Sequence, residues 1–391
     1  MIHMSSIRDQ FLLDPDITYL NHGSFGACPK PIFEDYQYWE RVLEFEPVQF
    51  IVKKREEHLL NAKKILANYI GCDDQDFFFI QNPTTAINQV VKSLELGPGD
   101  EVLTTDHEYG AMDKTFDFYS RKMGFHYRRQ EISLPLLSKE QFVEEFWKGY
   151  NERTKAIFIS HCTSTTALAF PVKEICKKAK SLGLITIVDG AHIPGHFPVC
   201  IRELNVDYYT GTLHKWLMSP KGCTFLYVHK DRQDSIEPLI ISWGYKAAMP
   251  TKSRFLEENE MQGTRDISAY LTVAAIFKFF KDFDIPARQA ECRLMIREQY
   301  PVFCELLGTS PISTISEEFL GQMCSIPIRT KNPLKLKEAL YHDHHIEIPV
   351  MQRGSETYLR ISYQVYNRPE ELEKLKNAVR RLDIIPVALS S

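Results

Sequence analysis

The 391-residue sequence has no long apolar run, no Cys-x-x-Cys pair and no block of like charges. No stretch approaches the ~20 apolar residues that a membrane-spanning helix needs, and residues 1–20 lack the basic start and apolar run of a signal peptide. The nine cysteines are scattered, which favours reduced thiols over disulfides or a zinc site. These absences predict a soluble, cytoplasmic protein.

The charge pattern also excludes several kinds of partner. Both signs are interspersed and the net charge is -4, so there is no basic stripe for nucleic acid. The run His342 to His345 lacks the spacing of a tetrahedral site, and we expect no bound metal. The expected partners are therefore a small molecule and a second copy of the chain.

The sequence does contain many apolar residues, and they recur in a regular pattern along the chain. Hydrophobic residues make up 44% of the chain, and single cores stop growing near ~250–300 residues, so a large and a small domain are expected. Short apolar runs alternate with segments of helical period, which is typical of a mostly parallel α/β sheet covered by helices. The expected strands are 77–80, 101–105, 156–161, 184–189, 207–210 and 224–229.

Composition also suggests where the domains meet. Residues 241–266 mix glycine, proline and charges, and a helical segment follows at 267–283. We predict an N-terminal segment at 1–18, a large domain at 19–265, a connecting helix at 266–285 and a small α/β domain at 286–391.

Two residues that follow expected strands suggest the chemistry. Asp189 ends the apolar run Ile185-Thr-Ile-Val-Asp189, and Lys215 lies in Thr210-Gly-Thr-Leu-His-Lys-Trp216. An aspartate beneath a pyridine nitrogen keeps that nitrogen protonated, and a desolvated lysine forms an imine (Schiff base) with an aldehyde. Either residue alone has a simpler explanation, as a helix cap or a solvated lysine. Together they indicate a pyridoxal 5'-phosphate (PLP) site.

The flanking motifs resemble a known family. Val188-Asp-Gly-Ala-His192 and Thr212-Leu-His-Lys215 are similar to the class V aminotransferases, which are PLP enzymes of fold type I. That likeness implies the aspartate-aminotransferase fold, with a seven-stranded sheet in the large domain. Three further motifs resemble the isopenicillin N epimerase-like branch, close to the carbon–sulfur lyases of ergothioneine biosynthesis. They are Tyr19-Leu-Asn-His-Gly-Ser-Phe-Gly26, Thr105-Asp-His-Glu-Tyr-Gly110 and Gln262-Gly-Thr-Arg-Asp266.

The cofactor phosphate is expected where a strand turns into a helix at Gln81 to Ile87, because free helix N–H groups attract anions. Thr84 and Thr85 would donate hydrogen bonds there, although they could equally act only as helix caps. The resemblance adds Thr212 and His214 to the phosphate site. It also implies that Thr264 reaches the phosphate from the neighbouring subunit, which makes a homodimer the expected assembly.

The resemblance places the remaining site residues around the cofactor ring and the substrate. Tyr109 would stack on the pyridine face, although a core tyrosine is the simpler interpretation. His192 would bond the phenolic oxygen of the cofactor, and Asn21 and His22 would close over the substrate.

Arginines near the end of the chain indicate how a substrate is held. Arg360 would hold the substrate α-carboxylate through two parallel hydrogen bonds, the alternative being a surface charge on an edge strand. Arg353 nearby hints at a second acidic group or a polar side chain on the substrate.

The sequence leaves the reaction open. An amino acid bound through PLP can lose its α-proton to Lys215 and then undergo β-elimination or epimerisation. An ordinary aminotransferase and a non-catalytic PLP-binding protein are the alternatives, although the complete set of Lys215, Asp189, Tyr109 and Arg360 argues against the second. A cysteine desulfurase is disfavoured because residues 345–356, just before Arg360, contain no nucleophilic cysteine.

Overall fold

A seven-stranded sheet forms the centre of the computed structural model, which describes residues 7–382. The strand order is β2-β8-β7-β6-β5-β3-β4, and the pairings are parallel except those that β8 makes with β2 and β7. This arrangement confirms the α/β fold expected from the sequence. The strands are β2 (Phe77–Ile80), β3 (Glu101–Thr105), β4 (His126–Gln130), β5 (Thr154–Ser160), β6 (Ile185–Gly190), β7 (Tyr208–Thr212) and β8 (Thr224–Val228).

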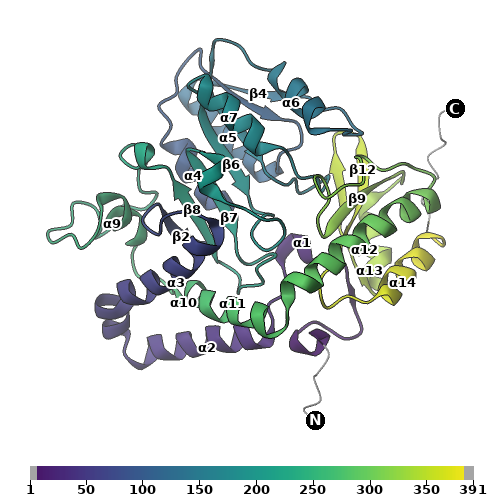
Figure 1. Cartoon of the computed structure of the whole chain (residues 1–391), viewed down its shortest axis with the longest axis horizontal. Coiled ribbons are helices and arrows are strands. Elements are labelled where there is room, and N and C mark those ends of the chain that lie inside the picture. Colours follow the sequence, from purple (N-terminus) through teal and green to yellow (C-terminus); the bar gives the residue numbers. More distant parts are fainter. Residues whose placement is uncertain (1–6, 383–391) are drawn as a thin grey trace.

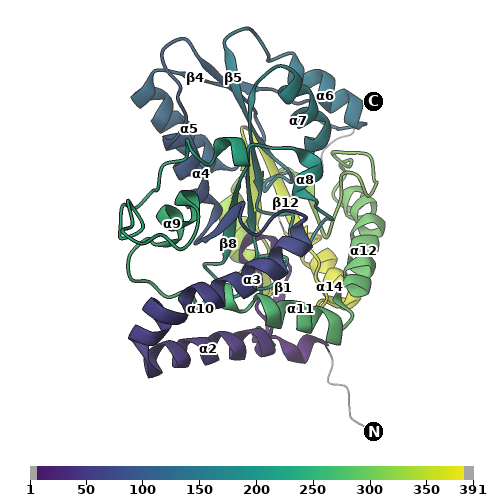
Figure 2. The same cartoon turned by 60° about the vertical axis from the view of Figure 1, so that its left-hand side comes forward.

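Helices cover both faces of this sheet, as Figures 1 and 2 show. The side chains of one strand therefore enter two different cores. Ile157 and Ile159 of β5 pack into one core, whereas Phe158 packs into the other. Burial on both faces explains why the strands read as continuous apolar runs. The covering helices include α4 (Pro83–Lys92), α5 (Gly110–Met123), α6 (Lys139–Trp147), α7 (Val172–Ser181) and α8 (Ile201–Leu204).

A separate helical layer lies below the sheet in Figure 2. The short helices α10 (Ser268–Leu271) and α11 (Val273–Asp282) pack against the long helices α2 (Lys30–Phe45) and α3 (Arg55–Ile70). A π-helix, η2 (Gln49–Lys54), joins α2 to α3. The remaining helices of this part of the chain are η1 (Ile7–Gln10), α1 (His22–Phe25), η3 (Lys230–Arg232) and α9 (Arg254–Glu260).

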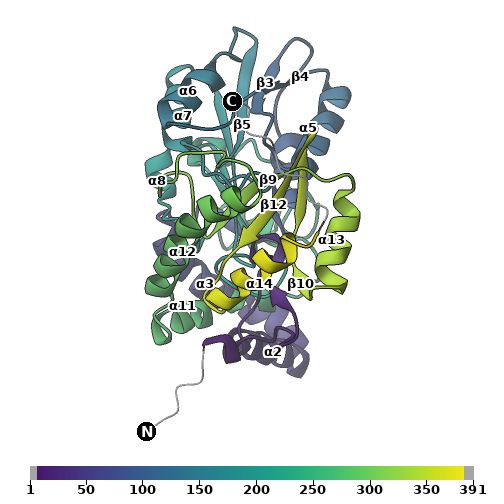
Figure 3. The ribbon, with the colours of Figure 1, turned by 90° about the vertical axis from the view of Figure 1, so that its right-hand side faces the viewer.

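The C-terminal part contains a three-stranded antiparallel sheet in the order β11-β12-β9. Figure 3 shows its helices grouped around β9 and β12. A further parallel pair joins β1 to β10, so the start of the chain is bonded to the C-terminal part. The elements are β1 (Thr18–Tyr19), α12 (Ile285–Leu306), β9 (Met323–Ile328), α13 (Pro333–His342), β10 (Ile346–Glu347), β11 (Val350–Arg353), β12 (Glu356–Ser362) and α14 (Pro369–Val379).

Each of the six strands expected from the sequence corresponds to a strand of the large sheet, within a few residues. Strand β4 was missed because its sequence is polar and it lies at the sheet edge, paired only with β3. The helix expected at 267–283 is two helices, α10 and α11. They are separated at Thr272, whose hydroxyl donates to the Ala269 carbonyl and competes with helical hydrogen bonding.

The predicted domain boundaries stay predictions. Residues 1–6 of the expected N-terminal segment and residues 383–391 of the expected C-terminal domain lie outside the described residues. Within residues 7–382, no helix combines the length and the apolar content needed to cross a membrane.

Candidate active site

The predicted site residues meet at the carboxyl ends of three neighbouring strands. Ser160 on β5 lies beside Asp189 on β6, which lies beside Thr210 on β7. Ligands of open parallel sheets bind at this edge. A cavity of about 170 Å³ opens there. The predicted residues that line it are Thr84, Tyr109, Asp189, His192, His214 and Lys215.

Lys215 is a partly buried amine that lines this cavity. Its Nζ lies 3.0 Å from Nε2 of His192. Burial lowers the pKa of Lys215 from 10.5 to about 8, with Asp189 opposing the shift and Arg360 adding to it. The amine can therefore lose its proton near neutral pH, as a nucleophile or base requires.

The short helix α1 holds the backbone of Lys215 in place. His22 is fully buried, with Nε2 2.9 Å from the Lys215 carbonyl oxygen and Nδ1 3.0 Å from the Tyr366 hydroxyl. Gly26 has a φ of +69°, and a Cβ there would clash with the carbonyl oxygens of His214 and Lys215. Both ring nitrogens of His22 are engaged within the chain, so its predicted contact with substrate stays a prediction.

Asp189 supplies a buried carboxyl on the floor of the cavity. Its Oδ1 accepts a hydrogen bond of 2.9 Å from the Ala191 amide. Burial raises the pKa of Asp189, while the Ala191 amide and the Lys215 amine act in the opposite direction. A cationic ring nitrogen would stabilise this carboxylate further.

The N-terminus of α4 forms the end of the cavity where phosphate is expected. Asn82 caps this helix by accepting a hydrogen bond of 2.8 Å from the Thr85 amide, so the threonines themselves are not the caps. Thr85 also donates its hydroxyl to Asn82, whereas Thr84 faces the cavity. The Thr212 hydroxyl is buried without a hydrogen-bond partner. An anion here would be bound by the helix end and by this free hydroxyl.

Arg360 is a buried cation on the central strand of the small sheet, which excludes the alternative of a surface charge on an edge strand. Its guanidinium donates to the backbone and hydroxyl oxygens of Ser164 and to the hydroxyl of Ser24, and it lies 3.4 Å from Oδ1 of Asn21. Burial lowers its pKa to about 10. No carboxylate within residues 7–382 forms an ion pair with it. An unpaired buried cation is a binding site for an anion.

Tyr109 also lines the cavity and is 47% exposed. The residues before it are buried and bonded. Glu108 accepts hydrogen bonds from the Thr105 hydroxyl at 2.7 Å and the Ser160 amide at 2.9 Å, and burial raises its pKa to about 8. The loop that ends at Tyr109 is thus fixed to both β3 and β5.

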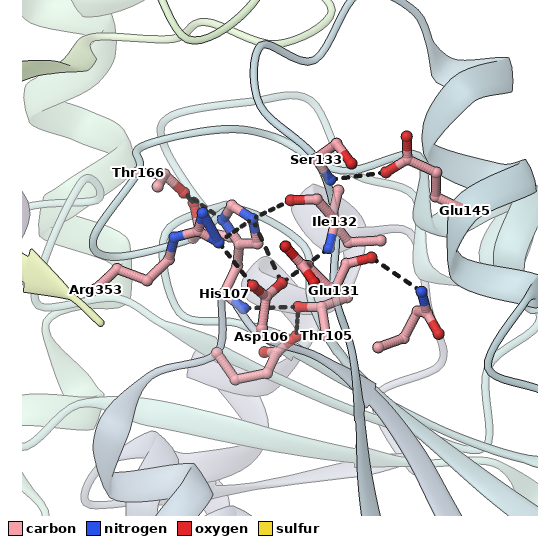
Figure 4. A network of polar contacts seen from close by, with 12 residues as sticks. Thr105, Asp106, His107, Glu131, Ile132, Ser133, Glu145, Thr166 and Arg353 are labelled. Carbon is pink, nitrogen blue, oxygen red and sulfur yellow. Dashed lines mark hydrogen bonds and ion pairs between the residues drawn. The ribbon is translucent and has the colours of Figure 1, made fainter. Parts of the chain in front are cut away.

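A second set of contacts fixes the same loop to the small sheet (Figure 4). Nη1 of Arg353 lies 2.8 Å from Oδ2 of Asp106 and 2.9 Å from Nε2 of His107. Its Nη2 bonds Glu356. His107 also reaches the Thr166 hydroxyl at 3.1 Å. Because both guanidinium Nη groups already have carboxylate partners, the hint that Arg353 binds a second acidic group of the substrate is not supported.

Sequence reasoning missed several lining residues. Ser160, Cys162 and Ser164 follow β5 and line the cavity, and Arg360 bonds Ser164. The rule that selected Asp189, a polar residue at the carboxyl end of a buried strand, would have found them too. Thr264 is exposed and does not line the cavity within one chain, so its role as a cross-subunit contact stays a prediction.

The residues present fit PLP. The cavity combines a partly buried amine of lowered pKa, a buried carboxyl and a helix N-terminus. Thr212, at the end of β7 and outside the lining of the cavity, adds a buried hydroxyl without a hydrogen-bond partner. Each matches one functional group of the cofactor: its aldehyde, its ring nitrogen and its phosphate.

Comparison with known proteins agrees with this chemistry. The profile of the aminotransferase class-V family matches residues 49–375. An isopenicillin N epimerase of Amycolatopsis lactamdurans is 31% identical, over 97% of this chain and 98% of that protein. A probable chloroplastic L-cysteine desulfhydrase of Arabidopsis thaliana is 27% identical, over 97% and 86%. A hercynylcysteine sulfoxide lyase of Schizosaccharomyces pombe is 22% identical, over 93% and 94%.

A solved structure shows the same fold. A variant of C-DES with glycine covalently linked to its PLP cofactor superposes with a TM-score of 0.80 at 20% identity, covering 97% of this chain and 100% of that one. The family and the branch expected from the motifs are confirmed, and PLP is the cofactor. The chain belongs to the aminotransferase class-V family and is a PLP-dependent enzyme related to isopenicillin N epimerase.

Proposed function

We propose that this enzyme removes the α-proton of an amino acid and then expels a sulfur substituent from the β-carbon. One observation carries the proposal. The cavity contains a partly buried amine, Lys215, whose pKa is about 8, and the buried guanidinium of Arg360 adjoins it with no carboxylate partner among residues 7–382. A base and an anchor for a carboxylate are the two groups that α-deprotonation of an amino acid requires.

Arg360 would hold the α-carboxylate. Its guanidinium is fixed by Ser24 and Ser164, so it is already oriented before a substrate arrives. Two parallel hydrogen bonds from a fixed guanidinium set the plane of the carboxylate and, with it, the direction of the Cα–H bond. Asn21, within 3.4 Å of the same guanidinium, would contact the same substrate group.

Bound PLP supplies an electron sink that stabilises negative charge at Cα. Asp189 would keep the ring nitrogen protonated, Tyr109 would cover the ring face, and His192 would bond the phenolic oxygen. The phosphate would be held by Thr84, Thr212 and His214. The amide and hydroxyl of Thr85 both donate to Asn82, so its phosphate contact stays a prediction.

Lys215 would act as the base with its amine free and neutral, as its pKa of about 8 allows. Its amine takes the α-proton, the electrons of the Cα–H bond form the Cα–Cβ double bond, and sulfur leaves with the electron pair of the C–S bond. Hydrolysis of the resulting enamine gives a 2-oxo acid and ammonia. The name of the desulfhydrase relative supports this outcome.

Persulfide transfer is less well supported. Ile346, in the segment where a desulfurase would carry its cysteine, is fully buried and paired with Thr18. The two-residue turn 354–355 joins β11 to β12, which leaves no long arm before Arg360. Residues 345–356 therefore lack the thiol that sulfur transfer needs, and strands β10 and β11 take up half of the segment.

Epimerisation is the second candidate, because the epimerase relatives are 31% identical to this chain. It would need a proton donor on the face of Cα opposite Lys215. The phenol of Tyr109, which also lines the cavity, would be that donor.

A homodimer is part of the proposal. Thr264 is exposed, which suits a residue that completes the phosphate site of a partner. Mixing Lys215→Ala chains with Thr264→Asp chains should restore activity that neither has alone, because one site of each hybrid dimer is intact. No recovery after confirmed subunit exchange would contradict the shared site.

One experiment separates the candidate reactions. Cysteine, cystine, cysteine S-conjugates and their sulfoxides are incubated in D2O with the PLP-loaded enzyme. Elimination releases pyruvate and ammonia, epimerisation gives the D-amino acid with deuterium at Cα, and transamination gives a 2-oxo acid that keeps the side chain. Deuterium exchange without pyruvate from any sulfur substrate would replace elimination by epimerisation.

A further inference from the structure

A buried indole lies next to the histidine that contacts Lys215. Nε1 of Trp216 donates a hydrogen bond of 3.3 Å to Nδ1 of His192, whose Nε2 lies 3.0 Å from Nζ of Lys215. Trp216 is fully buried and His192 is 2% exposed. The three side chains form a continuous line, which we call the Trp216–His192–Lys215 line.

The chemistry of these groups determines which nitrogen of His192 carries its proton. An indole N–H can only donate, so Nδ1 of His192 must present its lone pair. Burial lowers the pKa of His192 well below 6.5, and the charges of Lys215 and Arg360 lower it further, so the ring is neutral. A neutral imidazole has one N–H, which therefore lies on Nε2. That N–H points at Lys215.

Trp216 keeps its position without help from His192. Its ring stacks on His196, with centroids 4.0 Å apart and planes inclined by 14°, and it contacts His22 at 5.0 Å. Nε2 of His196 accepts the Gln322 amide, so Nδ1 of His196 donates to the His192 carbonyl oxygen. The indole is thus held by rings that have their own partners.

We propose that Trp216 is a positioning residue that fixes the Nε2–H tautomer of His192 and so makes His192 a permanent hydrogen-bond donor toward Lys215 and the atom of PLP that adjoins it. This proposal rests on the proposed attachment of the cofactor to Lys215. In the apoenzyme the acceptor is the Lys215 nitrogen in its unprotonated form, which is reached above its pKa of about 8, and in the holoenzyme it would be the phenolic oxygen.

The donor has a measurable consequence. A hydrogen bond to the phenolic oxygen, or to the free Lys215 nitrogen, stabilises the unprotonated form of that acceptor. It therefore lowers the pH midpoint at which the acceptor group titrates. Without the indole, His192 can place its proton on Nδ1 and turn a lone pair toward the acceptor. The loss of one hydrogen bond corresponds to a rise of about half a unit to one unit in that pH.

The charged and titratable groups that face the line are the same in every variant used below. They are Arg360, His22 and His196 around His192, and Asp189, Cys162 and Arg360 around Lys215.

Trp216→Phe removes the indole N–H and keeps an aromatic ring against His196. The readout is the pH midpoint of the visible absorbance of the PLP-loaded enzyme without substrate. We expect the midpoint of Trp216→Phe to rise by about half a unit to one unit. An unchanged midpoint would overturn the proposal.

His192→Gln provides the matched background, because a side-chain amide donates through its NH2 group whatever Trp216 does. The double variant that carries both Trp216→Phe and His192→Gln should have the same pH midpoint as His192→Gln alone. Equal shifts in both backgrounds would mean that Trp216 acts through packing alone, which would overturn the tautomer assignment.

If Trp216→Phe does not fold, the unaltered holoenzyme gives the answer. In protein labelled with 15N-histidine, His192→Gln identifies the His192 signals, and their shifts distinguish a protonated Nε2 from a protonated Nδ1. A proton on Nδ1 would overturn the proposal. Borohydride reduction followed by peptide mapping tests the attachment to Lys215 separately, so the two failures are distinguishable.

Discussion

The two sides of the cavity are built differently. The inner wall (Asp189, His192 and Lys215) comes from neighbouring strand ends of one sheet; Asp189 and His192 are almost fully buried and Lys215 is partly buried. The outer wall (Tyr109 and the loop 106–108 before it) ends in a half-exposed ring, and Arg353 from the small sheet holds it. The inner wall obtains its properties from desolvation, whereas the outer wall depends on contacts between distant parts of the chain.

This comparison separates two tasks. A wall shielded from water can hold a lysine at a pKa of about 8 and a neutral histidine as a donor. A wall attached to the small sheet can respond to what Arg360 binds, because Arg353 and Arg360 lie on adjacent strands of that sheet. Substitutions on the inner wall should therefore change the chemical steps of the reaction. Substitutions on the outer wall should change the efficiency with which the enzyme carries out that reaction.

The largest effect is expected from Lys215→Ala on the inner wall. The variant should bind PLP but lose turnover, because both the attachment point and the base are gone. Mass spectrometry after borohydride treatment should find the cofactor on Lys215 in the unaltered enzyme and on no lysine in the variant. Lys221→Ala, outside the cavity, is the control and should keep the label. A label on another lysine of the unaltered enzyme would refute the assignment of Lys215.

Arg360→Ala tests the anchor between the two walls. A charged hydrogen-bonded contact contributes roughly 1.5–3 kcal/mol, so amino-acid binding should weaken by about one to two decades while PLP affinity barely changes. Titration of the bound-cofactor absorbance with substrate measures both. Arg360→Lys should recover only part of the affinity, because an ammonium cannot make the two parallel bonds. Unchanged substrate affinity in Arg360→Ala would return Arg360 to a structural role.

Tyr109→Ala should act on the cofactor before any substrate arrives. Loss of ring stacking removes about 0.5–1.5 kcal/mol, so PLP should dissociate several-fold more readily and its absorbance should change. Tyr109→Phe keeps the stacking and removes only the phenol. A normal spectrum with slowed α-deuterium exchange in Tyr109→Phe would assign a proton-transfer role to the phenol, and a normal rate would exclude it.

The smallest effect is expected from Arg353→Gln on the outer wall. The pair with Asp106 is partly buried, and its loss should cost about 1 kcal/mol of the free energy of unfolding and lower kcat several-fold by loosening the loop before Tyr109. The pH midpoint of the cofactor absorbance should stay unchanged, because Arg353 does not face the inner wall. Glu356→Gln removes only the more exposed partner and serves as the control. A shifted midpoint in Arg353→Gln would contradict the separation of the two walls.

The inner wall could largely be predicted from the sequence, because buried parallel strands read as apolar runs and their ends meet at one edge. Asp189 and Lys215 follow two such runs. The outer wall could be predicted only in part. The resemblance indicated Tyr109, but the bond between Asp106 and Arg353 joins residues far apart in the chain, and nothing in local composition indicates it.

The tautomer of His192 and the missing counter-charge of Arg360 are harder to predict from the sequence. The bond from Trp216 to His192 depends on the relative orientation of two loops after neighbouring strands. The absence of a carboxylate beside Arg360 within residues 7–382 emerges only when the surrounding side chains are in place.

Arg360 has no carboxylate partner among residues 7–382, which makes the melting temperature of the enzyme a reporter of its ligands. A desolvated cation without a counter-ion lowers the free energy of unfolding, and a bound carboxylate restores part of it. By mass action, a ligand at one hundred times its Kd adds about 2.7 kcal/mol. A thermal-shift screen of amino acids and their sulfur conjugates would therefore rank candidate substrates with no assumption about the reaction, and Arg360→Ala would show which shifts come from the carboxylate.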